Sequence, residues 1–360
     1  MSNPLLDDLA QQFRGRTVLV TGADGLMGSH LTEALVGGGA AVHAFVRATS
    51  GGRLRNIAHL RDKVIVHRGD LTDRQSVDLA LRALKDTSSR PSVFHLGAQP
   101  NIGESWERPY QTIAVNVLGT LNLLQGVVDL GLDLASFVLA GSSTQFSANV
   151  QEGQASAGLE VAAGGVLSEG APLRPQSIYG TTKAAAEFLV MNFYDAYGVP
   201  ASVARMFNHY GPRQSPRYIT GTIITQALLR SEVKLGSLEP KRDFCFSEDG
   251  VRAHLLIALR GSPGTVYCYG QGRSCSIGEW ARMILQVGQK HGYWAHREIV
   301  ADANRVRPSH SEVTGLAADF SRLQQDTGWE PRVSWEEGLH RTIRWYAEHQ
   351  DSWKGLEDWK

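Results

Sequence analysis

The chain lacks an excess of charge of either sign, because its 360 residues carry 36 lysines and arginines against 36 aspartates and glutamates. A balanced charge builds no field that would attract nucleic acid or an anionic membrane, so we expect neither as a partner. Cysteine is scarce, and the three cysteines have no metal-ligand spacing, so we expect no metal site and a reducing, cytoplasmic location. The first residues carry acids and lack an apolar signal core, and we find no apolar run long enough to span a bilayer.

Short apolar runs and helical patterns alternate through the first half of the chain, as in a βαβ protein. A segment rich in Gly, Ala, Ser and Gln, residues 147–175, interrupts this alternation and is typical of a loop. We predict an α/β fold: a Rossmann-type, doubly wound parallel sheet over residues 1–205, loop included, and a smaller C-terminal α/β substrate lobe over residues 206–360, with some segments returning to the sheet. The expected strands are 17–21, 41–46, 63–67, 92–96, 137–140 and 201–206, and the expected helices 26–36, 110–130, 179–197, 219–230, 276–291 and 335–349.

A glycine-rich loop, Gly22-x-x-Gly25-x-x-Gly28, lies directly between the first expected strand and the first expected helix. Glycines permit a tight turn and let the backbone approach a pyrophosphate, which the helix N-terminus attracts through its N–H groups and partial positive charge. A glycine-rich turn without a cofactor is the alternative, but the position between strand and helix is the one that the mechanism needs. The loop therefore predicts a bound dinucleotide.

The end of the second strand indicates which dinucleotide binds. An NAD-specific site usually ends this strand with an acid for the ribose hydroxyls, whereas this chain has Arg47, followed by Thr49 and Ser50. A guanidinium and two hydroxyls suit a 2′-phosphate, which favours NADP slightly over NAD; the alternative is a solvated Arg47. After the third strand, Asp70 and Leu71 suit an adenine edge, or else form an ordinary turn with Asp70 as a helix cap.

Tyr179 and Lys183 lie four residues apart in a helical pattern, so their side chains share one face of the helix. A cationic lysine near a phenol favours the phenolate and lowers the pKa of the tyrosine. Such a phenolate can take a hydroxyl proton while a hydride leaves the same carbon. Ser142, just past the fifth strand, can donate a hydrogen bond to the same oxygen. The three residues predict an alcohol oxidoreductase site.

Several blocks of sequence carry a resemblance to a known family. They begin at Val42 (VHAFVRATS), Asn56 (NIAHL), Gly69 (GDLTD), His95 (HLGAQ), Val115 (VNVLGTLNLL), Arg205 (RMFNHYGPRQSPR), Leu235 (LGSLEPKRDF) and Arg307 (RP, followed by Glu312-Val313). Together with the glycine loop and the Tyr/Lys pair, they resemble the extended short-chain dehydrogenase/reductases that remodel nucleotide-diphosphate sugars. The likeness covers nearly the whole chain and is strongest to GDP-mannose 4,6-dehydratases and GDP-4-keto-6-deoxymannose reductases.

The resemblance implies a tightly bound NADP or NAD and a GDP- or UDP-linked sugar as substrate. It assigns catalysis to Ser142, Tyr179 and Lys183, with Thr144 beside them. Cofactor contacts are expected from Gly22, Gly25, Leu26, Met27, Gly28, Arg47, Thr49, Ser50, Asp70, Leu71, Leu96, Ala98, Tyr179 and Lys183. Substrate contacts are expected from Gln99, Ser143, Asn208, Arg213, Arg242 and Arg307, of which Asn208 matches an asparagine at the diphosphate and Arg242 and Arg307 match phosphate-clamping arginines. A surface salt bridge is the alternative for each arginine.

One departure from the family pattern concerns the reaction type. The 4,6-dehydratases carry an acid two positions after the catalytic hydroxyl, where this chain has Thr144. A threonine cannot act as that base near neutral pH, although Glu152 or Glu169 of the long loop could supply one. The order Ser142-Ser143-Thr144 is instead similar to sugar 4-epimerases.

We therefore predict a nucleotide-sugar 4-epimerase working through a transient 4-keto sugar. A 4,6-dehydratase, a 4-keto-6-deoxy-sugar reductase and a catalytically idle dinucleotide sensor are the alternatives. The long helical patterns 110–130 and 179–197 suggest pairing with a second chain, as a homodimer or homotetramer.

Overall fold

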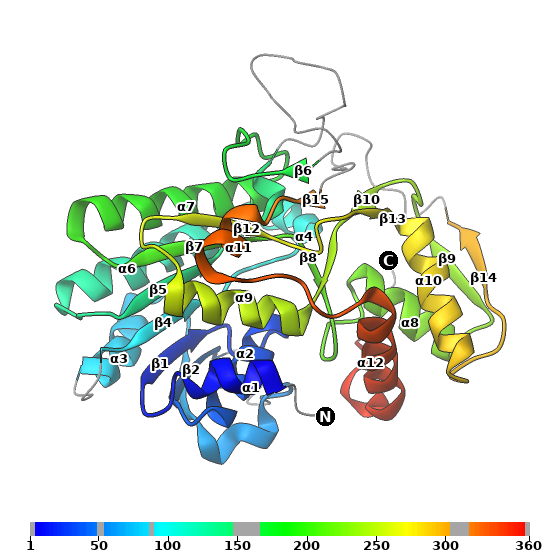
Figure 1. Cartoon of the computed structure of the whole chain (residues 1–360), viewed down its shortest axis with the longest axis horizontal. Helices are drawn as coiled ribbons and strands as arrows, with labels where there is room; N and C mark the ends of the chain where they lie inside the picture. Colours follow the sequence, from blue (N-terminus) through cyan, green and yellow to red (C-terminus); the bar gives the residue numbers. More distant parts are fainter. Residues whose placement is uncertain (1–3, 49–53, 86–89, 147–165, 303–316, 357–360) are drawn as a thin grey trace.

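The computed structural model describes residues 4–48, 54–85, 90–146, 166–302 and 317–356 (Figure 1). Its centre is a seven-stranded sheet in the order β3-β2-β1-β4-β5-β7-β12, and every neighbouring pair of strands is parallel. The predicted Rossmann-type fold class is thereby confirmed. The strands are β1 (Thr17–Thr21), β2 (Ala41–Arg47), β3 (Ile65–Gly69), β4 (Ser92–His95), β5 (Ser136–Ala140), β7 (Ala201–Met206) and β12 (Val266–Tyr269).

Helices cover both faces of this sheet, because successive residues of each strand point to opposite sides. In β1, Val18 and Val20 join one apolar cluster and Leu19 joins the other. The first cluster is completed by α1 (Pro4–Gln11), α2 (Leu26–Gly37), α9 (Ser247–Arg260) and α11 (Ser321–Thr327). The second is completed by α3 (Arg74–Lys85), α6 (Gly119–Asp129) and α7 (Ile178–Tyr197).

The predicted helix 110–130 is one helical run, made of α5 (Pro109–Ile113), a π-helical turn (Ala114–Leu118) and α6. It follows the short helix α4 (Ile102–Glu107). By length and composition alone this run is apolar enough to cross a membrane, contrary to our expectation that no such run exists, but core helices meet the same test. Here it packs against α3 and α7.

A second lobe lies beside the sheet, at the right of Figure 1, and has its own apolar core. Its centre is a group of aromatic rings in which Trp280 stacks on Phe244 at 4.1 Å between ring centroids. The lobe contains α8 (Ile219–Leu229), α10 (Ile277–Lys290), α12 (Trp335–Glu348) and the strand pairs β8 (Asn208–Tyr210) with β11 (Phe244–Phe246), β9 (Glu232–Leu235) with β14 (Glu298–Ala301), and β10 (Lys241–Arg242) with β13 (Cys275–Ser276). A last pair, β6 (Val166–Leu167) and β15 (Ala317–Ala318), lies above the sheet in this view.

The sequence pattern missed α9, which is buried over most of its length. Glu248, Asp249, Arg252 and His254 are all buried in it, so polar residues do not mark an exposed face. Helix α9 and strand β12 lie beyond residue 205 in the chain but pack on the sheet. The division at residue 205 stays a prediction. Of the segment 147–175, the described part begins at β6.

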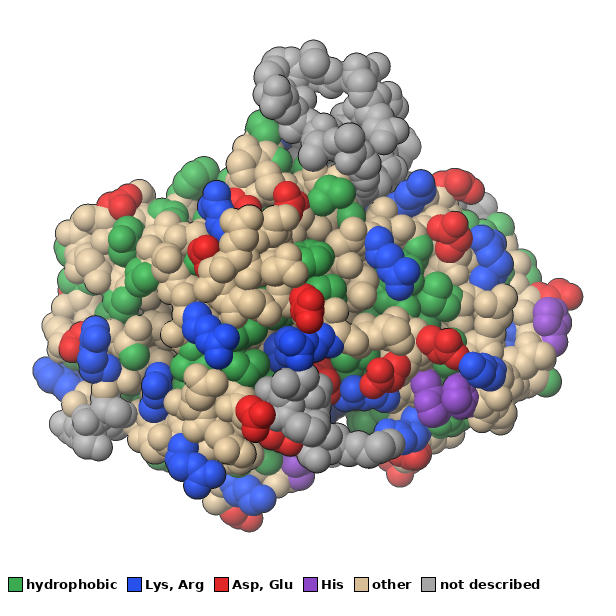
Figure 2. All heavy atoms as spheres, viewed as in Figure 1, with side chains coloured by type: hydrophobic (Ala, Val, Ile, Leu, Met, Phe, Trp, Pro, Cys, Tyr) green, Lys and Arg blue, Asp and Glu red, His purple; other side chains and the backbone are tan. Residues whose placement is uncertain are grey.

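The face of the molecule seen in Figure 2 carries lysines and arginines interspersed with aspartates and glutamates. This mixture is what the balanced charge of the sequence leads one to expect. The strand order reverses between β1 and β4, and the crevice beyond the carboxyl ends of these strands is where open α/β sheets bind ligands. The glycine loop follows β1 there, and residues 96–99 follow β4.

Candidate active site

The glycine loop is shaped by close backbone approaches that no side chain would allow. Gly22 has φ +68°, and a Cβ on it would lie 2.8 Å from the amide nitrogen of Gly97. A Cβ on Gly28 would lie 2.1 Å from the carbonyl oxygen of Gly22. Gly25 is the N-cap of α2 and offers no side chain to its N–H groups. The first N–H groups of α2 therefore have no side-chain cap, and the glycines leave room beside them, which suits a dinucleotide pyrophosphate.

The other predicted cofactor residues gather around this loop. The side chain of Leu71 reaches the backbone of Gly97, beside Gly22, and Leu96 donates its N–H to the Thr21 carbonyl at 3.2 Å. Met27 is buried beneath the loop. Leu26 begins α2, and Ala98 follows β4, partly buried.

Two further predicted cofactor residues, Asp70 and Arg47, lie at the ends of strands β3 and β2. The Asp70 carboxylate accepts hydrogen bonds from the N–H and hydroxyl of Thr72, at 2.9 and 2.7 Å, in a local turn. The start of α3 is capped instead by Asp73, which accepts the N–H groups of Gln75 and Ser76. Arg47 ends β2 and is exposed. Thr49 and Ser50 lie outside the described residues.

A short turn after β5 holds the catalytic hydroxyls. The Ser142 and Thr144 hydroxyl oxygens are 2.8 Å apart, and the Ser142 oxygen also accepts the Thr144 N–H at 3.2 Å. The Ser142 N–H donates to the Gln145 side-chain oxygen at 3.0 Å. Ser143 lies between them, partly buried. A backbone hydrogen-bonded at this many points holds the Ser142 oxygen in a fixed place.

The catalytic helix α7 brings Tyr179 to the same place, where its phenol is hydrogen-bonded with Ser142. Burial raises the pKa of Tyr179, and the Ser142 hydrogen bond opposes that rise without cancelling it. Lys183 is buried and donates to the Ala140 carbonyl at 2.9 Å, and burial lowers its pKa to about 8. The expected lowering of the Tyr179 pKa by Lys183 is therefore wrong for the protein in this state, because desolvation outweighs it.

A residue missed by the sequence argument, Asn116, ties the site together from the π-helical turn. Its side chain exchanges hydrogen bonds with the backbone of Gln99, at 2.7 and 3.1 Å, and donates to the Thr182 hydroxyl at 2.9 Å. Thr182 donates in turn to the Tyr179 carbonyl. An asparagine within a helical pattern carries no signal by itself, because only the π-turn aims it at the catalytic helix.

The side chain of Gln99 is a candidate ligand contact. It is 8% exposed, and both its amide nitrogen and its amide oxygen are buried without a hydrogen-bond partner among the residues that the structure describes. A buried amide is costly unless hydrogen-bonded, so a ligand group at this place would satisfy it. The backbone of Gln99 is held by Asn116, which fixes the amide beside the catalytic helix.

Of the two loop acids considered for dehydration, Glu152 lies outside the described residues and Glu169 is committed elsewhere. The Glu169 carboxylate accepts the Cys268 N–H at 2.6 Å, and Arg322 approaches it at 3.8 Å. A second buried acid, Glu187 on α7, pairs with Arg205, and its side chain is 5% exposed. Neither carboxylate is placed to act as a base in the crevice.

The predicted substrate residues divide into two groups. Asn208, in β8, is exposed, and Arg242, in β10, is half-buried, with its Nη1 atom donating to the Lys241 carbonyl at 2.8 Å. Arg213 instead pairs with Glu33 of α2 at 2.5 Å, as the salt-bridge alternative requires. Arg307 lies outside the described residues.

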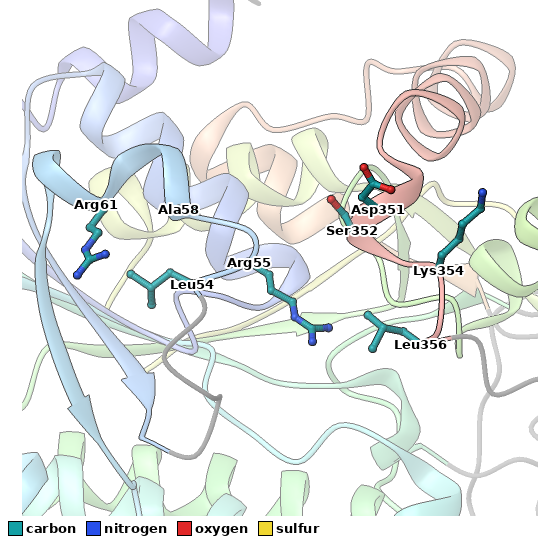
Figure 3. A pocket seen from close by; sticks show the side chains of 8 residues that line it. All are labelled: Leu54, Arg55, Ala58, Arg61, Asp351, Ser352, Lys354 and Leu356. Carbon is teal, nitrogen blue, oxygen red and sulfur yellow. The ribbon is translucent and has the colours of Figure 1, made fainter.

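A cavity of about 480 Å³ lies between the segment that follows β2 and the C-terminal end of the chain (Figure 3). It contains none of the catalytic residues, and in Figure 3 Arg55 points toward its C-terminal wall. Asn56, next to Arg55, donates its N–H and its side-chain amide to Asp24 of the glycine loop, both at 2.8 Å. The lining residues are Leu54, Arg55, Ala58, Arg61, Asp351, Ser352, Lys354 and Leu356.

Comparison with known proteins agrees with this site. The family model described as GDP-mannose 4,6 dehydratase matches residues 19–342. The chain is 30% identical to GDP-mannose 4,6 dehydratase 1 of Arabidopsis thaliana over 89% of this chain and 87% of that protein. It is also 30% identical to a dTDP-glucose 4,6-dehydratase of Streptomyces griseus over 94% and 96%.

Solved structures show the same fold. The structure of a UDP-glucose 4-epimerase from Thermotoga maritima, solved with UDP-glucose, has 26% identity and a TM-score of 0.78, covering 93% of this chain and 99% of that one. Other structures of this fold hold NAD or NADPH. A family match over residues 19–342, on a site with the glycine loop and the Ser/Tyr/Lys set, settles the family. The chain belongs to the GDP-mannose 4,6-dehydratase family, whose members are NAD(P)-dependent nucleotide-sugar enzymes.

Proposed function

We propose that this protein is a nucleotide-diphosphate-sugar 4-epimerase that keeps its nicotinamide cofactor bound through the reaction. The observation that carries the proposal is the side chain of Thr144. It stands where the dehydratase pattern has its acid, and its hydroxyl is hydrogen-bonded to the Ser142 hydroxyl. Two hydroxyls and a phenol can move one proton at C4, and epimerisation needs no further acid or base.

The carboxylates near the crevice support this choice. Glu169 and Glu187 are engaged with Cys268 and Arg205, away from a substrate. Among the described acids, Glu104 lies on α4, which packs against the catalytic helix α7, and its neighbour Ser105 accepts the Tyr179 N–H at 3.3 Å. Its carboxylate lies 3.9 Å from Arg108 and is partly exposed.

The chain's own residues perform the proton transfer. The base in this step is Tyr179, which would take the proton of the C4 hydroxyl as the C4 hydrogen leaves as hydride, while the Ser142 hydroxyl donates to the same oxygen. Burial raises the pKa of the Tyr179 phenol in the protein alone, and the positive charge of a bound oxidised nicotinamide would favour the phenolate. The nicotinamide supplies the hydride acceptor and donor when bound. The 4-keto sugar turns over in the site, the hydride returns to the other face of C4, and Tyr179 gives the proton back. At the end of the cycle neither the sugar nor the cofactor, which stays bound, would have undergone net oxidation.

The substrate that suits the described residues is a nucleotide-diphosphate hexose, GDP- or UDP-linked. A protein with no net charge must hold a diphosphate by local donors, which Asn208 and Arg242 would supply. NADP is the favoured cofactor because the exposed guanidinium of Arg47 ends β2. The three cysteines are buried and free, which suits a cytoplasmic enzyme.

The test is product analysis after incubation with GDP-, UDP-, dTDP- and CDP-hexoses in deuterated water. An epimerase returns the same hydrogen to C4 and never opens the C5–H bond. We therefore expect an unchanged mass, no deuterium on carbon and a changed C4 coupling pattern by NMR. A product lighter by one water, with deuterium at C5, would reject the epimerase.

The second candidate is a 4,6-dehydratase, and the observation that favours it is the likeness to dehydratases over nearly the whole chain. This reaction needs a base for the C5 proton and an acid for the C6 hydroxyl. If water is lost, Glu104 becomes the described residue to replace first, because Glu169 is held by Cys268. Glu104→Gln would then abolish dehydration while oxidation at C4 continues.

A homodimer fits the exposed aromatic side chains of the helices that flank the site. Tyr110 is 87% exposed and Trp106 is 55% exposed, on α5 and α4, and Phe188 is exposed on the neighbouring helix α7. Burial of such a surface by a second copy of the chain would stabilise both. Light scattering should give twice the chain mass, and Tyr110→Glu should halve it.

A further inference from the structure

Glu33, on the outer part of α2, joins two segments that are far apart in the sequence. One of its carboxylate oxygens lies 2.5 Å from an Arg213 guanidinium nitrogen, and the other lies 2.9 Å from the Nε2 atom of His59. Arg213 belongs to the turn that follows β8, here called the substrate turn (residues 211–214). His59 belongs to the segment 54–63 that follows β2, here called the cofactor strap. A single carboxylate therefore contacts both.

The cofactor strap is bound to the dinucleotide loop at its other end. Asn56 donates two hydrogen bonds to Asp24, which lies between Gly22 and Gly25. The strap thus has two polar attachments to the β1–α2 unit, Asp24 just before α2 and Glu33 farther along the helix. Its apolar residues Leu54, Ile57 and Leu60 are buried in the same cluster as α2. Any nucleotide held between the loop and the strap depends on both attachments for the position of the strap.

The substrate turn is held against α2 in a similar way. The Pro212 carbonyl is hydrogen-bonded to His30 Nε2 at 2.9 Å, one helical turn before Glu33. Arg213 has φ +71°, a conformation that L-residues rarely adopt and that surrounding contacts must impose. Gln214 donates its side-chain amide to the His209 carbonyl at 2.8 Å.

This arrangement connects the turn to a predicted ligand contact. His209 is the neighbour of Asn208, the residue expected at the substrate diphosphate. A shift of the turn would be passed through Gln214 to β8. Arg213 is therefore connected to β8 through the backbone of its turn, and Glu33, which pairs with its Nη2 atom, sets where that backbone lies.

Glu33, Arg213 and His59, here called the Glu33 triad, have electrostatics that support a stable ion pair between Glu33 and Arg213. Burial tends to raise the pKa of Glu33, but the charge and hydrogen bond of Arg213, with the His59 hydrogen bond, lower it below its ordinary value. The Arg213 side chain is only 15% exposed, whereas Glu33 and His59 are 42% and 48% exposed. A half-exposed hub gives modest coupling, of the size of partly screened ion pairs.

We propose that Glu33 is a positioning residue that couples the cofactor strap to the substrate turn. It holds the strap, which is tied to the glycine loop through Asn56, and the turn, which is tied to β8 through Gln214. The inference rests on the proposed function, because it takes the second lobe to bind a nucleoside diphosphate. Arg213, which the sequence led us to expect in contact with substrate, instead aligns the turn that carries the contact.

Three single variants separate the two contacts of Glu33: the substrate arm, which is its pair with Arg213, and the strap arm, which is its contact with His59. Glu33→Gln removes the charge and loosens both arms. Arg213→Gly removes only the substrate arm, and glycine accepts the positive φ without strain. His59→Ala removes only the strap arm. The matched control is Glu232→Gln, the same change at an exposed carboxylate on β9.

Binding is measured by calorimetry on the full chain, with NADP⁺ and NAD⁺ as one probe set and GDP, UDP and dTDP as the other. We expect Glu33→Gln to weaken both sets by about two- to fivefold. Arg213→Gly should weaken only the nucleoside diphosphates, and His59→Ala only the dinucleotides. The double variant of Glu33→Gln and Arg213→Gly should bind nucleoside diphosphates no more weakly than Glu33→Gln alone.

Thermal melting distinguishes this pattern from a merely structural role. If all three variants lower the melting temperature while every dissociation constant stays at its wild-type value, Glu33 has no positioning role. Equal weakening of dinucleotides and nucleoside diphosphates by Arg213→Gly would also overturn the inference. A wild-type protein that binds dinucleotides but none of the three nucleoside diphosphates would instead refute the proposed function, and the substrate arm of the inference with it.

Discussion

Replacement of Glu187 by glutamine should destabilise the whole domain. Glu187 and Arg205 form an ion pair inside the sheet–helix interface, where their side chains are 5% and 3% exposed. Arg205 donates through Nε and Nη2 to the two carboxylate oxygens, and Gln145 adds a third hydrogen bond at 2.9 Å. In Glu187→Gln the Arg205 guanidinium stays charged in the protein interior but loses the Glu187 carboxylate that balanced it. This should lower the free energy of unfolding by about 3–5 kcal/mol.

That loss of stability can be read from thermal melting. A chain of this length loses roughly 1.3 °C per kcal/mol, so the melting temperature should fall by about 4–7 °C. Glu336→Gln is the control, because it makes the same change in an exposed pair with Lys290 and should not move the melting temperature. A double replacement of Glu187 and Arg205 by methionine should melt above the single variant. A fall in Glu187→Gln no larger than in the control would refute the reasoning.

Three further changes test the cofactor and catalytic residues. Arg47→Ala should weaken NADP⁺ by about 10-fold or more, as expected for a lost charge-assisted phosphate contact, and leave NAD⁺ nearly unchanged; equal weakening by calorimetry would contradict it. Tyr179→Phe should lower turnover by roughly 10²–10⁴ with cofactor affinity retained. If the variant kept most of its activity, a group other than Tyr179 would have to be the base that takes the C4 hydroxyl proton. Burial lowers the pKa of Lys183 from 10.5 to about 8. Below pH 8 the folded protein must bury a charged ammonium, which lowers its free energy of unfolding. Between pH 8 and 10.5 the folded state loses this proton before the unfolded state does, so the free energy of unfolding rises with pH. The wild type should therefore gain about 3 kcal/mol of stability over Lys183→Met across this range, and parallel melting profiles would rule this out.

Patterns that depend on local spacing were readable from the sequence. The glycines at 22, 25 and 28 and the pair Tyr179 and Lys183 act within one turn or one helix, so their geometry follows from their separation alone. The parallel sheet with helices on both faces was implied by the βαβ alternation. Helix α9 was not, because burial on all sides removes the amphipathic period that marks a surface helix.

The features that could not be predicted depend on contacts between distant segments. Arg213 lies in a block that resembles substrate-binding sequences, yet its guanidinium finds Glu33, which is 180 positions earlier in the chain. Asn116 is placed by a π-turn that no residue type announces. The pKa of Tyr179 was expected to fall because a lysine is near, but burial acts on both residues and raises the pKa of the phenol.

The family is determined by features spread over the whole chain, whereas the reaction type depends on the few residues next to Ser142. Fold, cofactor loop and catalytic helix are common to enzymes that oxidise C4, and they determine only the first step. The fate of the 4-keto sugar depends on whether a group beside Ser142 can take the C5 proton before the hydride returns. Here that neighbour is Thr144, whose hydroxyl is already bonded to the Ser142 hydroxyl and cannot ionise near neutral pH. Thr144 is neutral and Glu169 is turned to Cys268, so neither residue offers a base for elimination. On this ground we propose that the hydride returns to C4 and that the 4-keto sugar goes back to an alcohol.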